Sequence, residues 1–189
     1  ILDSDLKAPQ PALYKARQVA DSTKAPLHVL VNAYSSAMVR AVGVDHERQD
    51  AARAQIHKAW QNRISELTDR ERCQLSILWH KDSMAALRES ILDLQPAMVV
   101  VHTSEESGLR RHLFTPRDWQ LIRKAPCPVL CVHGRQWPHA PRVLAALDPG
   151  TEEQPQDALA VNVLGAANHF AGNLGGTLRA THVLDEMDD

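Results

Sequence analysis

Residues 97–132, with the sequence AMVVVHTSEESGLRRHLFTPRDWQLIRKAPCPVLCV, decide the fold class of this chain. The apolar run at 97–101 is typical of a strand buried on both faces of a parallel sheet. Thr115 suits the N-cap of a helix and Pro116 suits its first position, while two later prolines end it. Val129–Val132 follows as a second apolar run. The stretch therefore predicts a strand, a loop, a helix and a second strand, in that order.

The beginning of the chain is repeated near its end. Residues 1–4 (ILDS) precede a helix-like segment and an apolar run at 26–31, and residues 146–149 (ALDP) precede a similar segment and a run at 177–183. Each copy predicts a strand that ends near an aspartate, a loop, a helix and a second strand. The distance between the copies is that of one whole domain, so the sequence predicts two related units.

The segment between the repeats supplies further elements. Four apolar residues at helical spacing predict one face of a long helix: Ile56, Trp60, Ile64 and Leu67. Apolar and polar residues alternate over 74–79, which is typical of a strand. Either Asp82 or Ser83 can cap a helix that runs toward residue 94.

Strands that alternate with helices predict an α/β fold. We expect a doubly wound, open, parallel five-stranded sheet with right-handed crossovers. Residues 1–133 would form the first unit, with its first strand truncated at the start, and residues 134–141 (GRQWPHAP) the linker. Residues 142–189 would form the N-terminal part of a second, incomplete unit.

Composition excludes several classes of protein. The chain has 189 residues, 44% of them hydrophobic, and a formal charge of −2 without a basic block, so we expect neither nucleic acid nor membrane as a partner. No signal peptide is visible, and we expect a cytoplasmic protein. Three cysteines without a C-x-x-C pair are typical of small core residues in a reducing compartment: Cys73, Cys127 and Cys131.

Several short segments together resemble one known family. Residues 124–132 (KAPCPVLCV) resemble the closing strand of the universal stress protein family. Residues 114–119 (FTPRDW), 78–80 (LWH) and 136–138 (QWP) resemble its tandem-domain type, and most of all the E-type members. The resemblance implies a Rossmann-like fold of the adenine nucleotide alpha hydrolase-like kind, with a Gly-x2-Gly-x9-Gly-Ser/Thr loop that binds phosphate.

The first unit departs from that loop at all four of its defining positions, which fall on His102, Glu105, Thr115 and Pro116. Glycines let the backbone approach phosphate and turn N–H groups toward it. Here Glu105 places a carboxylate where phosphate would lie, and Pro116 lacks an N–H group. We therefore expect a degenerate loop and an ordinary capped helix.

The resemblance also implies residues on the nucleoside side of the site. In the second unit they are Ala146, Asp148 and Val183, and in the first unit Asp3 corresponds to Asp148. A valine position of the family is occupied by Asn32 in the first unit. Aspartates at the carboxyl ends of parallel strands lie where open α/β folds bind ligands. The alternative is that each one caps its own loop through a local hydrogen bond.

No arrangement of nucleophile and base and no metal-binding pattern is visible, so we expect neither catalytic residues nor a metal. The favoured interpretation is a non-enzymatic stress protein, a tandem pseudo-dimer with a degenerate first nucleotide loop. The alternative is an ATP-binding protein or slow nucleotide hydrolase that acts through the second unit. No cofactor is required, although ATP could bind there. Expected partners are the two units within the chain and a second copy through the Val129–Val132 edge.

Overall fold

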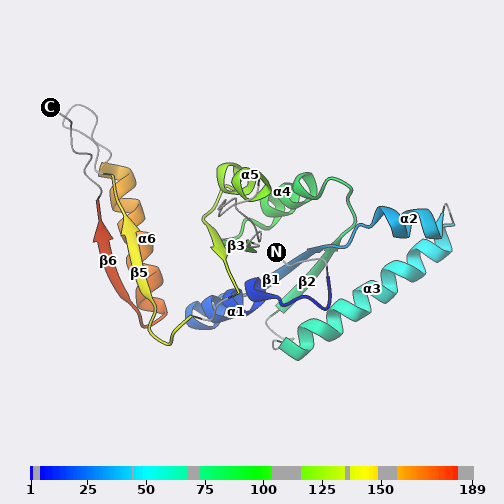
Figure 1. The fold of residues 1–189 in the computed structure, drawn as a ribbon, viewed down its shortest axis with the longest axis horizontal. Helices are drawn as coiled ribbons and strands as arrows, with labels where there is room; N and C mark the ends of the chain where they lie inside the picture. Colours follow the sequence, from blue (N-terminus) through cyan, green and yellow to red (C-terminus); the bar gives the residue numbers. More distant parts are fainter. Residues whose placement is uncertain are drawn as a thin grey trace, which may run out of the picture. The chain divides into compact units, whose positions relative to one another are not determined.

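The computed structural model describes residues 1, 5–43, 45–67, 73–103, 116–134, 137–148 and 157–182. They belong to two compact units, Ile1–Arg135 and Gln136–Asp189 (Figure 1). The point of division lies inside the expected linker.

The first unit alternates helices and strands, as expected. Its described elements are α1 (Pro11–Thr23), β1 (Leu27–Asn32), α2 (Ser36–Val42), α3 (His46–Leu67), β2 (Cys73–Leu78), α4 (Ser83–Leu94), β3 (Val99–His102), α5 (Pro116–Lys124) and β4 (Val129–Val132). The short helix α2 was not predicted. Its N-cap is Ser35, whose hydroxyl accepts from the Met38 N–H at 3.3 Å, and it ends at Gly43 with φ +69°.

The strands of this unit form two parallel pairs rather than the single five-stranded sheet that we expected. β1 pairs with β2 from Leu27–Cys73 to Asn32–Leu78, and β3 pairs with β4 from Val99–Val129 to His102–Val132. Ile1, the one described residue of the predicted first strand, donates its N–H to the Val100 carbonyl at 2.8 Å. Ile1 thus lies beside β3, and residues 2–4 lie outside the described residues.

A single cluster of buried side chains joins the two strand pairs to α4 and α5. It contains Leu30, Leu87, Ile91, Val99 and Leu121, and Ile1 packs against it. Since side chains alternate along a strand, Val29 and Val31 point to the opposite face of β1 from Leu30. They are 2% and 0% exposed, so β1 is buried on both faces, as expected for a parallel strand.

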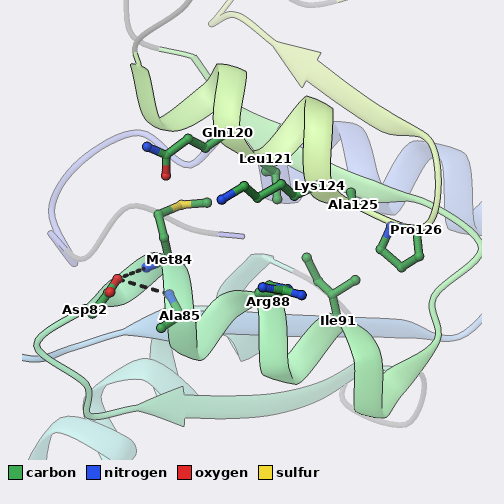
Figure 2. A pocket seen from close by; sticks show the side chains of 10 residues that line it. All are labelled: Asp82, Met84, Ala85, Arg88, Ile91, Gln120, Leu121, Lys124, Ala125 and Pro126. Carbon is green, nitrogen blue, oxygen red and sulfur yellow. Dashed lines mark hydrogen bonds between the residues drawn. The ribbon is translucent and has the colours of Figure 1, made fainter.

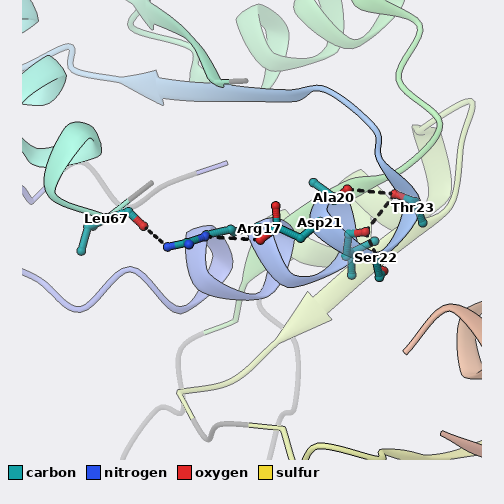
Figure 3. A network of polar contacts seen from close by, with 7 residues as sticks. Arg17, Ala20, Asp21, Ser22, Thr23 and Leu67 are labelled. Atoms are coloured by element: carbon teal, nitrogen blue, oxygen red, sulfur yellow. Dashed lines mark hydrogen bonds and ion pairs between the residues drawn. The ribbon is translucent and has the colours of Figure 1, made fainter. Parts of the chain in front are cut away.

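The predicted apolar face of α3 is confirmed. Trp60 is 1% exposed and Ile64 is 5% exposed, while Ile56 and Leu67 are half-buried. The carboxyl end of α3 is tied to α1, because Arg17 donates from Nη1 to the Leu67 carbonyl at 2.8 Å (Figure 3). A cation at this position also complements the negative end of the helix dipole.

The second unit contains β5 (Arg142–Ala146), α6 (Asp157–Asn173) and β6 (Thr177–Thr181). β5 and β6 pair in parallel from Arg142–Thr177 to Ala146–Thr181, as the repeat predicted. The glycine-rich segment 172–176 forms the turn at the end of α6, with Gly175 at φ +63° and the Gly176 N–H donating to the Ala171 carbonyl at 2.8 Å. Trp137 contacts Phe170 edge-on, with ring centroids 5.7 Å apart.

Candidate functional site at the carboxyl ends of the strands

The carboxyl ends of the parallel strands are the place where an open α/β fold would bind a ligand. In all three strand pairs, a polar side chain at the end of one strand bonds to groups just at or beyond the end of its neighbour. We refer to these interactions as clasps. They are made by Asn32, Thr103 and His182.

The Asn32 clasp joins the ends of β1 and β2. The side-chain amide donates from Nδ2 to the His80 carbonyl at 3.0 Å, and its Oδ1 accepts from the His80 N–H at 3.3 Å and the Tyr34 N–H at 3.4 Å. The Ala33 N–H also donates to the Leu78 carbonyl at 2.9 Å. Asn32 therefore uses both ends of its amide within the protein, at the position where the family resemblance implied a valine.

The same contacts lead to the start of α4. The His80 ring nitrogen Nδ1 lies 2.7 Å from the Asp82 carbonyl oxygen. Asp82 is the N-cap of α4, and its Oδ1 accepts from the N–H groups of Met84 and Ala85, both at 3.0 Å (Figure 2). The sequence left the cap open between Asp82 and Ser83, and the structure assigns it to Asp82.

The Thr103 clasp joins the ends of β3 and β4. Thr103 is 1% exposed, and its N–H donates to the Val132 carbonyl at 3.0 Å. Its hydroxyl also lies 3.4 Å from that carbonyl and 3.3 Å from Nδ1 of His133. Both groups are satisfied when the hydroxyl donates to Val132 and accepts from a protonated His133 Nδ1. Next to this clasp, the half-buried His102 is the last residue of β3.

The His182 clasp joins the ends of β5 and β6 in the second unit. Nδ1 of His182 lies 3.0 Å from the Leu147 carbonyl, which can only accept, so Nδ1 carries the hydrogen. The Leu147 N–H donates to the Thr181 carbonyl at 2.8 Å. On either side of Leu147, Ala146 and Asp148 are exposed. The structure thus brings these two predicted residues to one strand end.

Of the other predicted site residues, the structure describes some and not others. Pro116 begins α5, in agreement with its predicted position. Asp3, Glu105, Thr115 and Val183 lie outside the described residues. The degenerate loop, the Thr115 cap and the full nucleoside side of the second unit therefore stay predictions.

Sequence reasoning missed the clasps themselves. A polar residue at or just beyond each apolar run indicated that a side chain could bond at the strand end: Asn32, Thr103 and His182. Their partners could not be inferred, because the hydrogen bonds of Asn32 with His80 and of His182 with Leu147 span 48 and 35 residues.

The described side chains offer little reactive chemistry. Across the described ranges, no group of three or more His, Cys, Asp or Glu side chains is placed to hold a metal ion. Burial raises the pKa of the thiols of Cys73 and Cys127, and that of Cys131 is raised by burial and by the charge of Asp118. A raised pKa leaves little thiolate at neutral pH, so these thiols are poor nucleophiles. None of the described helices is long and apolar enough to span a bilayer.

Comparison with known proteins agrees with the arrangement of strands and helices. The model of the universal stress protein family matches residues 2–133. The chain belongs to the universal stress protein family. Among curated relatives, the universal stress protein E homolog of Haemophilus influenzae is 26% identical over 159 residues, which cover 82% of this chain and 52% of that protein. Universal stress protein E of Escherichia coli K12 is 29% identical over 86 residues, or 46% of this chain and 27% of that protein.

Solved structures with the same fold come from Pseudomonas aeruginosa. A putative universal stress protein of strain UCBPP-PA14 superposes with a TM-score of 0.67 at 23% identity, covering 92% of this chain and 56% of that one. A functionally unknown protein of strain PAO1 gives a TM-score of 0.69 at 23% identity, covering 95% and 57%. The chain thus spans about half the length of the relatives that match most of it. The predicted resemblance to E-type members is confirmed.

Proposed function

We propose that this chain acts without enzymatic activity in the stress response, and that its first unit is a scaffold which has lost nucleotide binding. The observation that carries the proposal is the state of the carboxyl strand ends in that unit. The side-chain amide of Asn32 is hydrogen-bonded to His80 and Tyr34, and the hydroxyl of Thr103 is hydrogen-bonded to the carbonyl at the end of β4. A ligand that needed these groups would have to break hydrogen bonds that are already formed.

The sequence of the adjacent loop supports the same proposal. Three of its four defining positions carry His102, Glu105 and Thr115 in place of glycine, and the fourth carries Pro116. A carboxylate in a phosphate cradle repels the ligand, and a proline removes one of the donors that the cradle needs. We also propose that the strands of the first unit form the five-stranded, doubly wound sheet of the family.

A second candidate function is nucleotide binding, or slow nucleotide hydrolysis, by the second unit. The observation that favours it is the position of Ala146 and Asp148, which are exposed at the end of β5, while the His182 clasp engages the backbone of Leu147 between them.

The two candidates are separated by titrating the chain with MgATP in a calorimeter and by measuring phosphate release. The scaffold proposal predicts that Asp3→Asn leaves any ATP affinity unchanged. The second candidate predicts measurable affinity that is weakened at least about tenfold by Asp148→Asn, the matched change in the other repeat. Affinity that depends on Asp3 and not on Asp148 would overturn the scaffold proposal, and affinity that Asp148→Asn leaves unchanged would overturn the second candidate.

A further inference from the structure

A cleft between α4 and α5 of the first unit lies apart from the strand ends and is independent of the function proposed above. Its volume is about 300 Å³, which is at the lower end of the range for small-molecule sites. Figure 2 shows the two helices facing each other across it. Apolar side chains line much of it, with Ile91 of α4 and Leu121 of α5 nearly fully buried at 2% and 5% exposure.

Two cations line this cleft, one from each helix. They are Arg88 of α4 and Lys124 of α5, and Figure 2 shows the Lys124 side chain directed toward Met84. The salt bridges found among the described residues involve Arg17, Arg48 and Arg63, and neither Arg88 nor Lys124 takes part in one. Both side chains are exposed and solvated by water when no ligand is present, and an anion bound between them would be attracted by both charges.

The helix dipole explains the position of Lys124 but not that of Arg88. Lys124 lies in the last turn of α5, where a positive charge is favourable in any case. Arg88 lies in the middle of α4, between Ser83 and Leu94, where the dipole gives no such reason. The dipole therefore favours Lys124 alone, and Arg88 is an exposed cation on the side of α4 that lines the cleft.

The charge balance and the lining limit the class of ligand. Among the described residues that line the cleft, Asp82 is the one carboxylate, and its Oδ1 accepts from two N–H groups at the start of α4. Two cations and one carboxylate leave a single net positive charge, which matches a monoanion. The thioether of Met84 projects into the same space and, with Ile91 and Leu121, offers an adaptable apolar wall to a hydrocarbon group (Figure 2).

We propose that the α4–α5 cleft binds a small amphipathic monocarboxylate. Its carboxylate lies between Arg88 and Lys124, and its aliphatic body lies against Met84, Ile91 and Leu121. The guanidinium of Arg88 can hold a carboxylate through two parallel hydrogen bonds, and Lys124 adds a point charge from the other side.

The test uses octanoate as the probe, kept below the concentration at which it forms micelles. The chain has four methionines, so a protein labelled at its methionine methyl groups gives a simple NMR spectrum in which Met84 reports on the cleft. Met38, in α2, serves as an internal reference. Octanoate is expected to shift the Met84 resonance in a saturable way and to leave Met38 in place. Octan-1-ol, which lacks the charge, is expected to bind at least about tenfold more weakly.

Two kinds of variant complete the test. Arg88→Gln with Lys124→Gln is expected to weaken octanoate binding at least about tenfold, whereas the matched pair Arg40→Gln with Lys58→Gln, on α2 and α3, removes the same charge without effect. Ala85→Leu fills the cleft and is expected to weaken binding with the charge unchanged. Both kinds of variant alter exposed residues, so folding is preserved. An unshifted Met84 resonance, equal binding of octan-1-ol, or equal binding by the double Gln variant would each overturn the proposal.

Discussion

Gly176 offers a sharp test of the second unit, because a side chain there would meet the backbone. A Cβ atom built at this position lies 2.1 Å from the carbonyl oxygen of Pro141, well inside any real contact distance. The same oxygen accepts the Thr177 N–H at 3.0 Å, a bond that starts the pairing of β5 with β6. Because the obstacle is backbone, no change of side-chain rotamer can relieve it, and the start of β6 must move.

The expected cost of Gly176→Ala follows from these two effects. Forcing extra volume into a packed site costs about 1–3 kcal/mol, and losing the Thr177 hydrogen bond adds roughly 1 kcal/mol. We expect a loss of about 2–4 kcal/mol in the local stability of the β5–β6 pair. At about 1.4 kcal/mol per tenfold, that loss corresponds to roughly 30-fold to 1,000-fold faster hydrogen exchange.

The assay is hydrogen exchange of the amides of β5 and β6, which reports on this unit independently of the first. Gly165→Ala is the control, since Gly165 lies within α6 and a Cβ there has nothing within 4 Å. Replacing a helical glycine by alanine is expected to stabilise by about 0.5–1 kcal/mol. Exchange in Gly176→Ala as slow as in Gly165→Ala would refute the reasoning.

Three further outcomes are expected in the first unit. Asn32→Val removes the clasp between β1 and β2 and should cost about 1 kcal/mol of unfolding free energy, measured in urea, whereas a gain would show that the clasp is dispensable. Asp82→Ala removes the cap of α4 and should also cost about 1 kcal/mol, with Asp93→Ala, near the end of the same helix, as a control that should cost nothing. Burial raises the pKa of the Cys73 thiol, so with rising pH the thiol ionises first in the unfolded chain, and the free energy of unfolding should fall as the pH rises above the ordinary thiol pKa of 9.0. The decrease of this free energy with pH should be shallower in Cys73→Ala, and an unchanged pH dependence would contradict the assignment.

Local features of the fold could be predicted because they depend on residues close in sequence. The apolar face of α3 at Trp60 and Ile64 follows from helical spacing, and the start of α5 at Pro116 follows from the preference of proline for the first helical position. Helix α2 was missed although Ser35 and Gly43 were adequate signals for its two ends, because its seven residues carry too short an apolar pattern.

Features that depend on residues far apart in sequence could not be predicted. In the parallel pair of β1 and β2, Asn32 lies opposite Leu78. Its contact with His80 also depends on the direction that the backbone and the side chains take after each strand ends, which the sequence pattern does not give. The cleft between α4 and α5 is of the same kind, since Arg88 and Lys124 lie on separate helices whose apposition comes from packing. The predicted nucleoside-side residues were inferred from a motif and not from contacts. Of these residues, the structure brings Ala146 and Asp148 to one strand end, whereas Asp3 and Val183 lie outside the described residues.

The burial of α3 is concentrated in one half of the helix, and this has a consequence for how the protein opens. Trp60 and Ile64 are its buried residues, and Arg17 holds its carboxyl end, while most side chains from His46 to residue 55 are exposed. The free energy required to unwind a turn should therefore rise along the helix toward Leu67. The first turns can therefore open and close while the last turns stay packed on the core, so a spectroscopic label on the exposed Ala54 should leave the rest of the unit folded.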